Sequence, residues 1–459
     1  MKPIKISEAA EAVGGKLVGN KEDFENVITG VFMDSRVVGA GDMFVAIKGE
    51  RNDGHEFIAS CFEKGASVAL CEHVPNGVTG PCIVVENSVT ALQKLASYYR
   101  DLLTDVKVIG VTGSVGKTST KEIISGVLSA RFRVVKSLMN HNNEIGLPLM
   151  VFHIEEDTQV AVLEMGISDF GEMRLLSSIA KPDICVITII GEAHMEALGS
   201  RDGILKAKTE IFEYMNKDGE VFVNGDDDKL STIGSVYGKP VHTYGFGTQN
   251  DLVISDVVNH GLEGSDFTAN DNGHVIRGHI NIPGRHMATN AALAVQISRF
   301  LGMTDEEIIK GLNLADTVAG RCKVTPSLNG FIIDDSYNAS PTSMRESIEV
   351  LKLSLSGRNV AILGDMLELG KDEEKLHADV GTYAVSRDID KLICVGRLSR
   401  NMYAAAKEVT GKSTEIVYYE TTDELLAHLN DEVAAGDNVL IKASNGMGFA
   451  KVVAALKAR

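Results

Sequence analysis

Residues 108–120 read Val108-Ile109-Gly110-Val111-Thr112-Gly113-Ser114-Val115-Gly116-Lys117-Thr118-Ser119-Thr120. A β-branched run ends here in a glycine-rich turn, and Lys-Thr and a helical segment follow. The backbone N–H groups of such a turn form a concave anion site, and the N-terminus of the next helix adds positive potential. The stretch therefore predicts a strand, a phosphate-holding loop and a helix, the opening unit of a nucleotide-binding α/β domain.

Individual residues of this loop have predictable roles. Lys117 is placed to reach the β- and γ-phosphates of a nucleotide, and the Thr118 hydroxyl is placed to bind Mg²⁺. The match to the G-x-x-x-x-G-K-[ST] pattern is incomplete, because Val111 occupies the place of the first glycine. The alternative is a glycine-rich turn that arose by chance. The expected phosphate-binding residues are Gly113, Ser114, Val115, Gly116, Lys117, Thr118 and Ser119.

The composition is that of a globular protein with several domains. The chain has 459 residues, of which 44% are hydrophobic, and this length predicts about two to four domains. Its net charge of −18 repels nucleic acid and anionic lipid. Trp is absent, which argues against a stacking platform for single strands. We therefore expect no nucleic-acid partner, and an anionic substrate needs local basic pockets.

Cysteine usage and hydropathy bear on the compartment. The six cysteines form no C-x-x-C pair, which predicts buried, reduced thiols in a cytoplasmic protein. Met1–Gly15 lacks the continuous apolar core of a signal peptide. The longest strongly apolar run, Ile184–Ile190, is too short to span a bilayer. We expect a cytoplasmic protein without membrane insertion, and we take it to be a monomer.

The chain divides into three segments by pattern. Residues 1–83 hold short strands and helices with many glycines and predict a small α/β domain. Residues 84–314 alternate strands and helices, which predicts a central P-loop domain with a parallel sheet. Residues 315–459 alternate in the same way and predict a doubly wound, Rossmann-like domain. The expected strands of the central segment are Val106–Val111, Val160–Glu164, Ile184–Ile190 and Val221–Asn224, with hairpins in Asp251–Ile282.

Polar residues follow two of the expected central strands. Glu164 ends the strand Val160–Glu164, and His194 follows Ile184–Ile190. Ligands bind beyond the C-terminal ends of strands in open α/β sheets, so both residues should lie on the edge that carries the phosphate loop. Both are candidate Mg²⁺ ligands near the γ-phosphate, and the alternative is that they are ordinary surface polar residues.

Four further features each have a functional and an ordinary reading. Lys208 lies on the expected helix Ile204–Met215, where a solvated lysine face is the ordinary reading. Asp335 closes a strand and is either a cleft residue or part of a capped turn. The amide-rich loop Asn140–Pro148 is either a substrate or nucleotide contact or a capped turn. Arg321 is either a phosphate ligand or half of a surface ion pair.

Together these residues resemble the Mur ligase family, the ATP-dependent amino-acid ligases of peptidoglycan precursor synthesis. The family's phosphate loop has the form Thr-Gly-[Thr/Ser]-x-Gly-Lys-[Thr/Ser], which Thr112–Thr118 matches. This form explains the missing first glycine. The resemblance covers almost the whole chain and includes Asn140–Pro148, Glu164-Met165-Gly166, the His194 segment, Ala207-Lys208, His286–Ala292 and Gly320-Arg321.

The resemblance implies ATP and Mg²⁺ as cofactors and assigns roles to residues. It implies that Lys208 is carbamylated and holds a second Mg²⁺ with Glu164 and His194, while Thr118 holds the first. These three residues and Lys117 are the implied catalytic residues. The remaining assignments are Asn290 to the adenine, Arg321 to the phosphates, Asp335 to the nucleotide or the cleft, Ser35 and Arg36 to a uridine diphosphate group, and Asn140 and Asn143 to the substrate.

Several stretches are most similar to the family member that joins D-alanyl-D-alanine to a UDP-N-acetylmuramoyl-tripeptide. They are Asp34-Ser35-Arg36, Gly41–Gly49, Asp53-Gly54-His55, Asp334–Pro341 and Gly364–Gly370. Two positions depart from the family pattern, Ser340 for Asn and Ala443 for Gly, and they leave only fine detail open. The resemblance implies an acyl-phosphate mechanism for this reaction. The competing readings are a ligase that adds a single amino acid, such as a folylpolyglutamate-type enzyme, and a P-loop switch protein.

Overall fold

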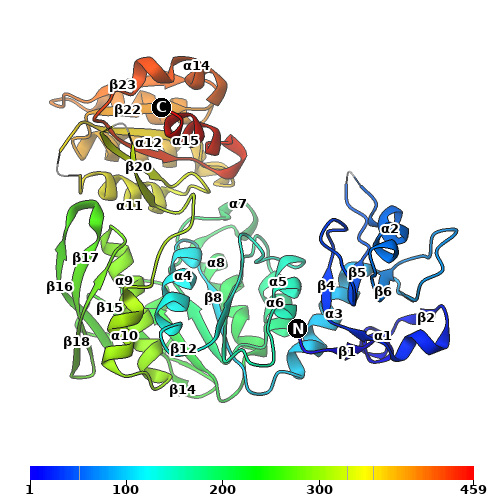
Figure 1. Ribbon diagram of the computed structural model, residues 1–459. Coiled ribbons are helices and arrows are strands. Elements are labelled where there is room, and N and C mark those ends of the chain that lie inside the picture. Colours follow the sequence, from blue (N-terminus) through cyan, green and yellow to red (C-terminus); the bar gives the residue numbers. More distant parts are fainter. Residues whose placement is uncertain (51, 328, 355) are drawn as a thin grey trace.

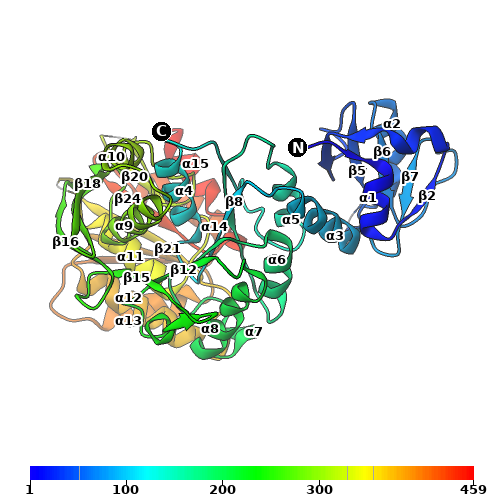
Figure 2. The ribbon, with the colours of Figure 1, turned by 90° about the horizontal axis from the view of Figure 1, so that it is seen from below.

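Three α/β units make up the molecule, and this confirms the predicted fold class (Figure 1). The computed structural model describes residues 1–50, 52–327, 329–354 and 356–459. The N-terminal unit, in blue, stands beside the α5–α6 side of the central unit, and the C-terminal unit, in yellow to red, lies above the central sheet. The turned view separates the N-terminal unit from the other two in the same way (Figure 2).

The N-terminal unit is a five-stranded sheet in the order β2-β7-β6-β5-β4, and only β2 runs antiparallel to its neighbour. A separate antiparallel pair, β1 with β3, adjoins it. The strands are β1 (Ile4–Lys5), β2 (Lys16–Val18), β3 (Val27–Ile28), β4 (Gly30–Phe32), β5 (Asp42–Val45), β6 (Val68–Cys71) and β7 (Cys82–Val84). The helices are α1 (Ile6–Val13), α2 (Ile58–Glu63) and α3 (Ser88–Asp101), which leads into the central unit.

The central unit is a nine-stranded sheet in the order β18-β17-β16-β15-β12-β11-β8-β10-β9, parallel from β16 to β9. Its strands are β8 (Lys107–Thr112), β9 (Val134–Lys136), β10 (Val160–Glu164), β11 (Ile184–Ile187), β12 (Glu220–Asn224), β15 (His242–Gly245), β16 (Leu252–Asn259), β17 (Ser265–Asp271) and β18 (His274–Ile280). Strands β13 (Ser235–Val236) and β14 (Lys239–Pro240) form a small hairpin. The helices are α4 (Lys117–Leu128), α5 (Gly146–Phe152), α6 (Glu172–Ala180), α7 (Met195–Leu198), α8 (Arg201–Thr209), α9 (Arg285–Phe300) and α10 (Asp305–Leu312).

Strand β8 shows why this sheet is covered on both faces. Its side chains alternate, so Ile109 and Val111 join the core with α4 and α9, while Val108 joins the core with α5 and α6. A strand buried on both faces reads as a continuous apolar run, as in residues 108–111. The C-terminal ends of β8, β10 and β11 therefore meet at one edge of the sheet, above a solid core.

The C-terminal unit is a six-stranded sheet in the order β19-β20-β24-β21-β22-β23, with only β19 antiparallel. Its strands are β19 (Lys323–Ser327), β20 (Gly330–Asp334), β21 (Asn359–Gly364), β22 (Lys391–Val395), β23 (Glu415–Tyr419) and β24 (Asn438–Lys442). Its helices are α11 (Pro341–Leu351), α12 (Glu373–Ser386), α13 (Ser399–Glu408), α14 (Thr422–Glu432) and α15 (Ala450–Lys457). Helix α11 faces α9 of the central unit, and the two share one apolar core.

Some predicted elements end at other residues than expected. The strand expected to reach Ile190 ends at Ile187, because the next residues turn toward the phosphate loop. The helix expected over Ile204–Met215 is α8 followed by a 3₁₀ turn, Glu210–Tyr214. All six cysteines are buried and free. Within the described ranges, no helix is both long enough and apolar enough to cross a membrane.

Candidate active site

The phosphate loop joins β8 to α4, and its glycines are required by geometry. Gly113 has a φ of 147°, and a Cβ there would lie 1.9 Å from Thr188 Oγ1. Gly116 has a φ of 84°, in the left-handed region. The loop is held from β11, since Ser114 N donates to Ile189 O at 2.8 Å and Thr188 Oγ1 donates to Val115 O at 2.6 Å. The turn is therefore preset before any ligand binds.

Positive charge converges on this turn. Helix α4 begins after Gly116 without a side-chain cap, so the dipole of a 12-residue helix and its first N–H groups face the loop. Lys117 Nζ lies over the loop and donates to Gly113 O at 2.8 Å. Burial lowers the pKa of Lys117 to about 8, although Glu164 opposes the shift. The arrangement fits an anion with several oxygens.

Two adjoining cavities lie at this edge. The smaller, about 100 Å³, is lined by the phosphate loop and by residues of the C-terminal unit, including Arg321, Asp335 and Lys442. The larger, about 540 Å³, extends along the outer side of the loop between β12, β15 and α9. Val115 and Gly116 line both cavities. A nucleotide can therefore place its phosphates in the smaller cavity and its base in the larger one.

Glu164 lies at the end of β10 and is 1% exposed. Its Oε1 accepts from Asn142 Nδ2 at 2.9 Å, and its backbone N donates to Ser137 Oγ at 3.0 Å. Among the described residues, Oε2 accepts no hydrogen bond, and the nearest cation, Lys121 Nζ, is 3.8 Å away. A buried carboxylate oxygen with no donor is a high-energy arrangement unless a cation binds it.

Lys208, on α8, is fully buried, and its Nζ has no hydrogen-bond partner within the described part of the chain. Burial, with a smaller effect from Lys117, holds the pKa of Lys208 well below its usual range. His194 also has a lowered pKa, caused first by burial and then by Lys117, while Glu368 opposes the shift. Lys117, Lys208 and His194 thus lie within electrostatic reach of one another, as the strand-end rule predicts for His194.

These residues fit a divalent cation. Glu164 Oε2 and Lys208 Nζ are two buried polar atoms without hydrogen-bond partners in the described chain, and each residue lies within electrostatic reach of Lys117. A carboxylate prefers a hard cation, whereas an amine does not, so Lys208 fits a metal only after conversion to an anion. The hydroxyl of Thr118, at the start of α4, lies beside Lys117 on the lining of the smaller cavity.

The C-terminal unit supplies the opposite wall of the smaller cavity. The Arg321 guanidinium lies 4.0 Å from the centre of the Tyr337 ring. Asp335 is already paired, because it accepts from Lys442 Nζ at 2.5 Å and from Ser347 Oγ at 2.6 Å. Arg321 therefore faces the phosphate loop as a stacked cation, while Asp335 positions the buried Lys442.

The larger cavity has an aromatic and amide lining. Asn290, on α9, is 8% exposed and lines it. Phe246, which follows β15, lies beneath the Arg285 guanidinium at 3.8 Å from the ring centre. Phe246 N donates to Asp226 Oδ2 at 2.6 Å, so the ring is held in place by its backbone. An aromatic face beside an amide is suited to a purine base.

The expected substrate residues lie away from both cavities. Arg36 pairs with Asp34, with Nη2 2.7 Å from Oδ2, and its side chain is 86% exposed. Asn143 Oδ1 accepts from Gly146 N at 2.8 Å and so caps the start of α5, and Asn140 is exposed in the same loop. Ser35 follows β4, and β4 packs against α5. The two expected substrate segments thus adjoin the same border between the N-terminal and central units.

The sequence assigns no individual role to five residues of this region, although Asn142 and Glu368 lie in stretches that carry the resemblance: Lys121, Asn142, Phe246, Glu368 and Lys442. Lys121 is 1% exposed, donates to Ser137 O at 2.7 Å and lies between Glu122 and Glu164. The only local signal for it was its place one turn after Lys117 on the same helix. Asn142 lies in the amide loop Asn140–Pro148, but the resemblance assigns the substrate to Asn140 and Asn143, whereas Asn142 is the residue that contacts Glu164.

Models of known protein families match most of this chain. The "Mur ligase family, catalytic domain" matches residues 27–101, the "Mur ligase middle domain" matches 111–298, and the "Mur ligase, glutamate ligase domain" matches 320–445. The UDP-N-acetylmuramoyl-tripeptide–D-alanyl-D-alanine ligase of Bacillus subtilis is 39% identical over 98% of this chain and 97% of its own.

Solved structures of two MurF enzymes also resemble this chain. MurF from Acinetobacter baumannii superposes with a TM-score of 0.90 at 29% identity, covering all of both chains. MurF ligase from Thermotoga maritima, solved in complex with ADP, superposes with a TM-score of 0.80 at 30% identity over 94% of this chain and 97% of that one. With three family domains matched along its length, the chain belongs to the Mur ligase family.

Proposed function

We propose that this protein is an ATP-dependent ligase that joins D-alanyl-D-alanine to a UDP-N-acetylmuramoyl-tripeptide. The observation that carries the proposal is the phosphate loop with Lys117 lying over it, together with Glu164, His194 and Lys208 within electrostatic reach of Lys117. The name of the 39% identical relative, which spans 98% of this chain, supports the choice of substrates. The ADP in the T. maritima structure supports the choice of nucleotide.

Amide formation from a carboxylate is uphill, so the carboxylate must first be activated. In the proposed reaction, an oxygen of the tripeptide's terminal carboxylate attacks the γ-phosphorus of ATP, and ADP leaves. The resulting acyl phosphate is attacked at its carbonyl carbon by the amine of D-alanyl-D-alanine. The amine loses a proton, phosphate leaves, and the new amide bond remains.

The first step brings two anions together, so the pocket must neutralise charge. Lys117 and the N-terminus of α4 are placed to hold the β- and γ-phosphates, and Arg321 approaches from the C-terminal unit. These groups stabilise charge that spreads over the transferring phosphoryl oxygens. Mg²⁺, when bound, supplies Lewis-acid charge neutralisation at the same oxygens. Thr118, Glu164, His194 and modified Lys208 are the residues proposed to hold it.

Lys208 is suited to carbamylation. Its amine is buried and has no hydrogen-bond partner in the described chain, so the uncharged form predominates more readily than in water. The nitrogen lone pair of an uncharged amine attacks CO₂, and the loss of one proton leaves a carbamate anion. The carbamate then matches Glu164 as an oxygen ligand. Modification thus turns a repulsive pair, Lys117 with Lys208, into an attractive one.

The acyl phosphate must be kept from water. The C-terminal unit reaches the central edge through Thr342 Oγ1, which donates to Glu192 Oε2 at 2.8 Å, and through Glu368, which contacts His194. The smaller cavity lies between the phosphate loop and residues of the C-terminal unit, which covers the proposed phosphate site. Exclusion of water strengthens each electrostatic interaction inside the cavity.

The substrate is proposed to run across the molecule. The uridine diphosphate group would bind the N-terminal unit at Ser35 and Arg36, and the amide loop would contact the substrate through Asn140 and Asn143. We propose residues 1–83, 84–314 and 315–459 as the substrate-binding, ATP-binding and dipeptide-adding domains.

The buried free thiols support a reducing, cytoplasmic setting.

The test is ADP release with each substrate supplied alone and together. We expect continuous, multiple-turnover release only when ATP, the UDP-linked tripeptide and D-alanyl-D-alanine are all present, with lysine and diaminopimelate tripeptides tested separately. Lys117→Ala should abolish ADP release, whereas Lys107→Ala, at the exposed start of β8, the strand that leads into the phosphate loop, should not. Near-normal turnover in Lys117→Ala contradicts the proposal. Release that needs neither substrate points to a switch protein, and release with single amino acids points to another ligase.

A further inference from the structure

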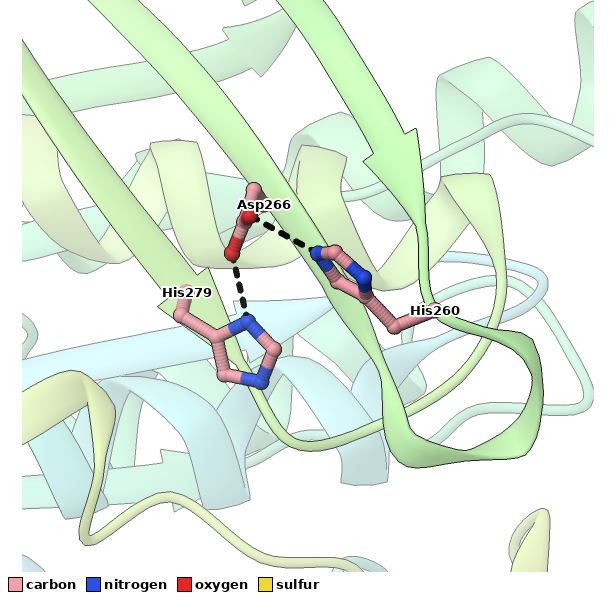
Figure 3. A group of neighbouring side chains, drawn as sticks. All are labelled: His260, Asp266 and His279. Atoms are coloured by element: carbon pink, nitrogen blue, oxygen red, sulfur yellow. Dashed lines mark hydrogen bonds and ion pairs between the residues drawn. The ribbon is translucent and has the colours of Figure 1, made fainter.

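A cluster of two imidazoles and a carboxylate lies on the antiparallel edge of the central sheet. Its three residues line neither of the two cavities proposed for the nucleotide. It consists of His260, Asp266 and His279 (Figure 3). Asp266 and His279 are directly opposite each other on β17 and β18, so their side chains share one face. His260 follows the end of β16, the strand that pairs with β17 on the other side.

The side chains converge. His260 Nε2 lies 2.7 Å from Asp266 Oδ2, and His279 Nδ1 lies 2.7 Å from Asp266 Oδ1. Figure 3 shows both rings turned toward the carboxylate between them. The candidate ligand atoms all lie within 4.8 Å of one another.

We propose that His260, Asp266 and His279 bind one late first-row divalent cation, Zn²⁺ above all. Imidazole nitrogens and a carboxylate suit Zn²⁺ and its neighbours, whereas Mg²⁺ prefers oxygen ligands. Zn–N bonds of about 2.0 Å place ligand atoms about 3.3 Å apart in a tetrahedron. The two 2.7 Å contacts therefore need to open by only about half an ångström. Each ring then carries its proton on the nitrogen that faces away.

The surroundings leave room for the rest of the coordination sphere. The three side chains are 42%, 52% and 34% exposed, so water can fill the fourth position. A cavity of about 500 Å³ adjoins Asp266 and His279. Asn259, the residue before His260, lines the larger nucleotide cavity and accepts from Ser265 Oγ at 2.9 Å. A bound cation would therefore tie the turn after Asn259 to β17 and β18.

The test is direct metal binding by the full-length chain without an affinity tag. Zn²⁺ is titrated calorimetrically into metal-free protein in excess Mg²⁺, and Co²⁺ replaces Zn²⁺ for a visible absorption readout. The variants are His279→Gln and Asp266→Asn. The matched control is His274→Gln, on the same strand β18 as His279, where Nε2 lies 2.8 Å from Asp305 Oδ2.

We expect wild type and His274→Gln to bind one more equivalent of Zn²⁺ than the two variants, or to bind it at least tenfold more tightly. The Co²⁺ absorption should be lost with the same two variants. Equal stoichiometry and affinity in all four proteins would overturn the proposal. Thermal unfolding without metal checks that each variant is folded, which is expected because the side chains are exposed. Ligase turnover is not read out, so a failure here leaves the proposed function standing.

Discussion

His194 of the central unit and Glu368 of the C-terminal unit meet across the cleft, with Nδ1 2.7 Å from Oε2. Both residues have left-handed backbone conformations, with φ values of 62° and 64°. Such conformations are costly for residues other than glycine and are concentrated at functional sites. The pair links the proposed metal-binding pocket to the unit that would add the dipeptide.

Glu368→Gln should slow turnover without unfolding the protein. The carboxylate orients the His194 ring, and its side chain is 60% exposed, so its contribution to stability is small. We expect kcat to fall about threefold to tenfold, which corresponds to about 0.7–1.4 kcal/mol. Glu374→Gln, at an exposed position on α12, is the control. If Glu368 acts through His194, its effect should disappear in a His194→Ala background, and additive effects would contradict the link.

Lys208→Ala should lose activity and recover part of it when short carboxylic acids are added. The added carboxylate would occupy the place of the carbamate beside Glu164. The variant loses no hydrogen bond of the Lys208 amine in the described chain, and thermal unfolding checks that it is folded. Lys206→Ala, two residues earlier and exposed over Phe170, should remain active. Full activity in Lys208→Ala would refute the carbamate.

Phe246→Ala should weaken nucleotide binding rather than chemistry. The ring forms one wall of the larger cavity and supports the Arg285 guanidinium. We expect the KM for ATP to rise about tenfold with kcat nearly unchanged, since an aromatic contact contributes about 0.5–1.5 kcal/mol beyond its burial. The control is Phe170→Ala, because Phe170 also lies under a cation, Lys206, but lines neither cavity. A change confined to kcat would mean that the base binds elsewhere.

His377 should make the C-terminal unit sensitive to acid. The ring is fully buried, its Nε2 accepts from Met366 N at 2.9 Å, and its Nδ1 donates to Glu373 O at 2.7 Å. Burial lowers the pKa of His377 from 6.5, so below that pH the unfolded chain binds a proton that the folded one does not. The contribution of the neutral His377 ring to the free energy of unfolding is complete above pH 6.5 and is lost as the pH falls toward the pKa of His377 in the folded state.

The measurement is the urea midpoint of wild type and His377→Gln at about pH 7.5 and about pH 5.5. Circular dichroism serves as the probe because the chain has no Trp. As the pH falls, the free energy of unfolding of the wild type should decrease by up to about 1.4 kcal/mol per pH unit more than that of His377→Gln. His428→Gln, which removes a 55% exposed histidine from the same unit, should keep the wild-type slope. Parallel slopes in wild type and His377→Gln would contradict the assignment.

Most of the fold could be predicted from the sequence because its buried parallel strands are short apolar runs separated by helices. Strand β10 lies at the predicted residues, and β12 begins one residue before the predicted strand and ends with it. The edge strand β23 (Glu415–Tyr419) and the following α14 were not predicted, because β23 is only partly buried and its pattern is mixed. An edge strand lacks the double-sided burial that produces a continuous apolar run.

The sequence by itself determined the phosphate loop, because that site is built from one continuous turn and the helix after it. Thr112–Thr118 carries the backbone geometry, the cation and the hydroxyl within a few residues. Only the tertiary structure decided which distant side chains meet this loop. The fold buries Glu164 and Lys208 within electrostatic reach of Lys117, each with a polar atom that has no hydrogen-bond partner in the described chain, and domain docking brings Glu368 to His194. Local periodicity reports which face of an element is buried, but the free energy of burying Lys208 depends on elements far from it in the chain.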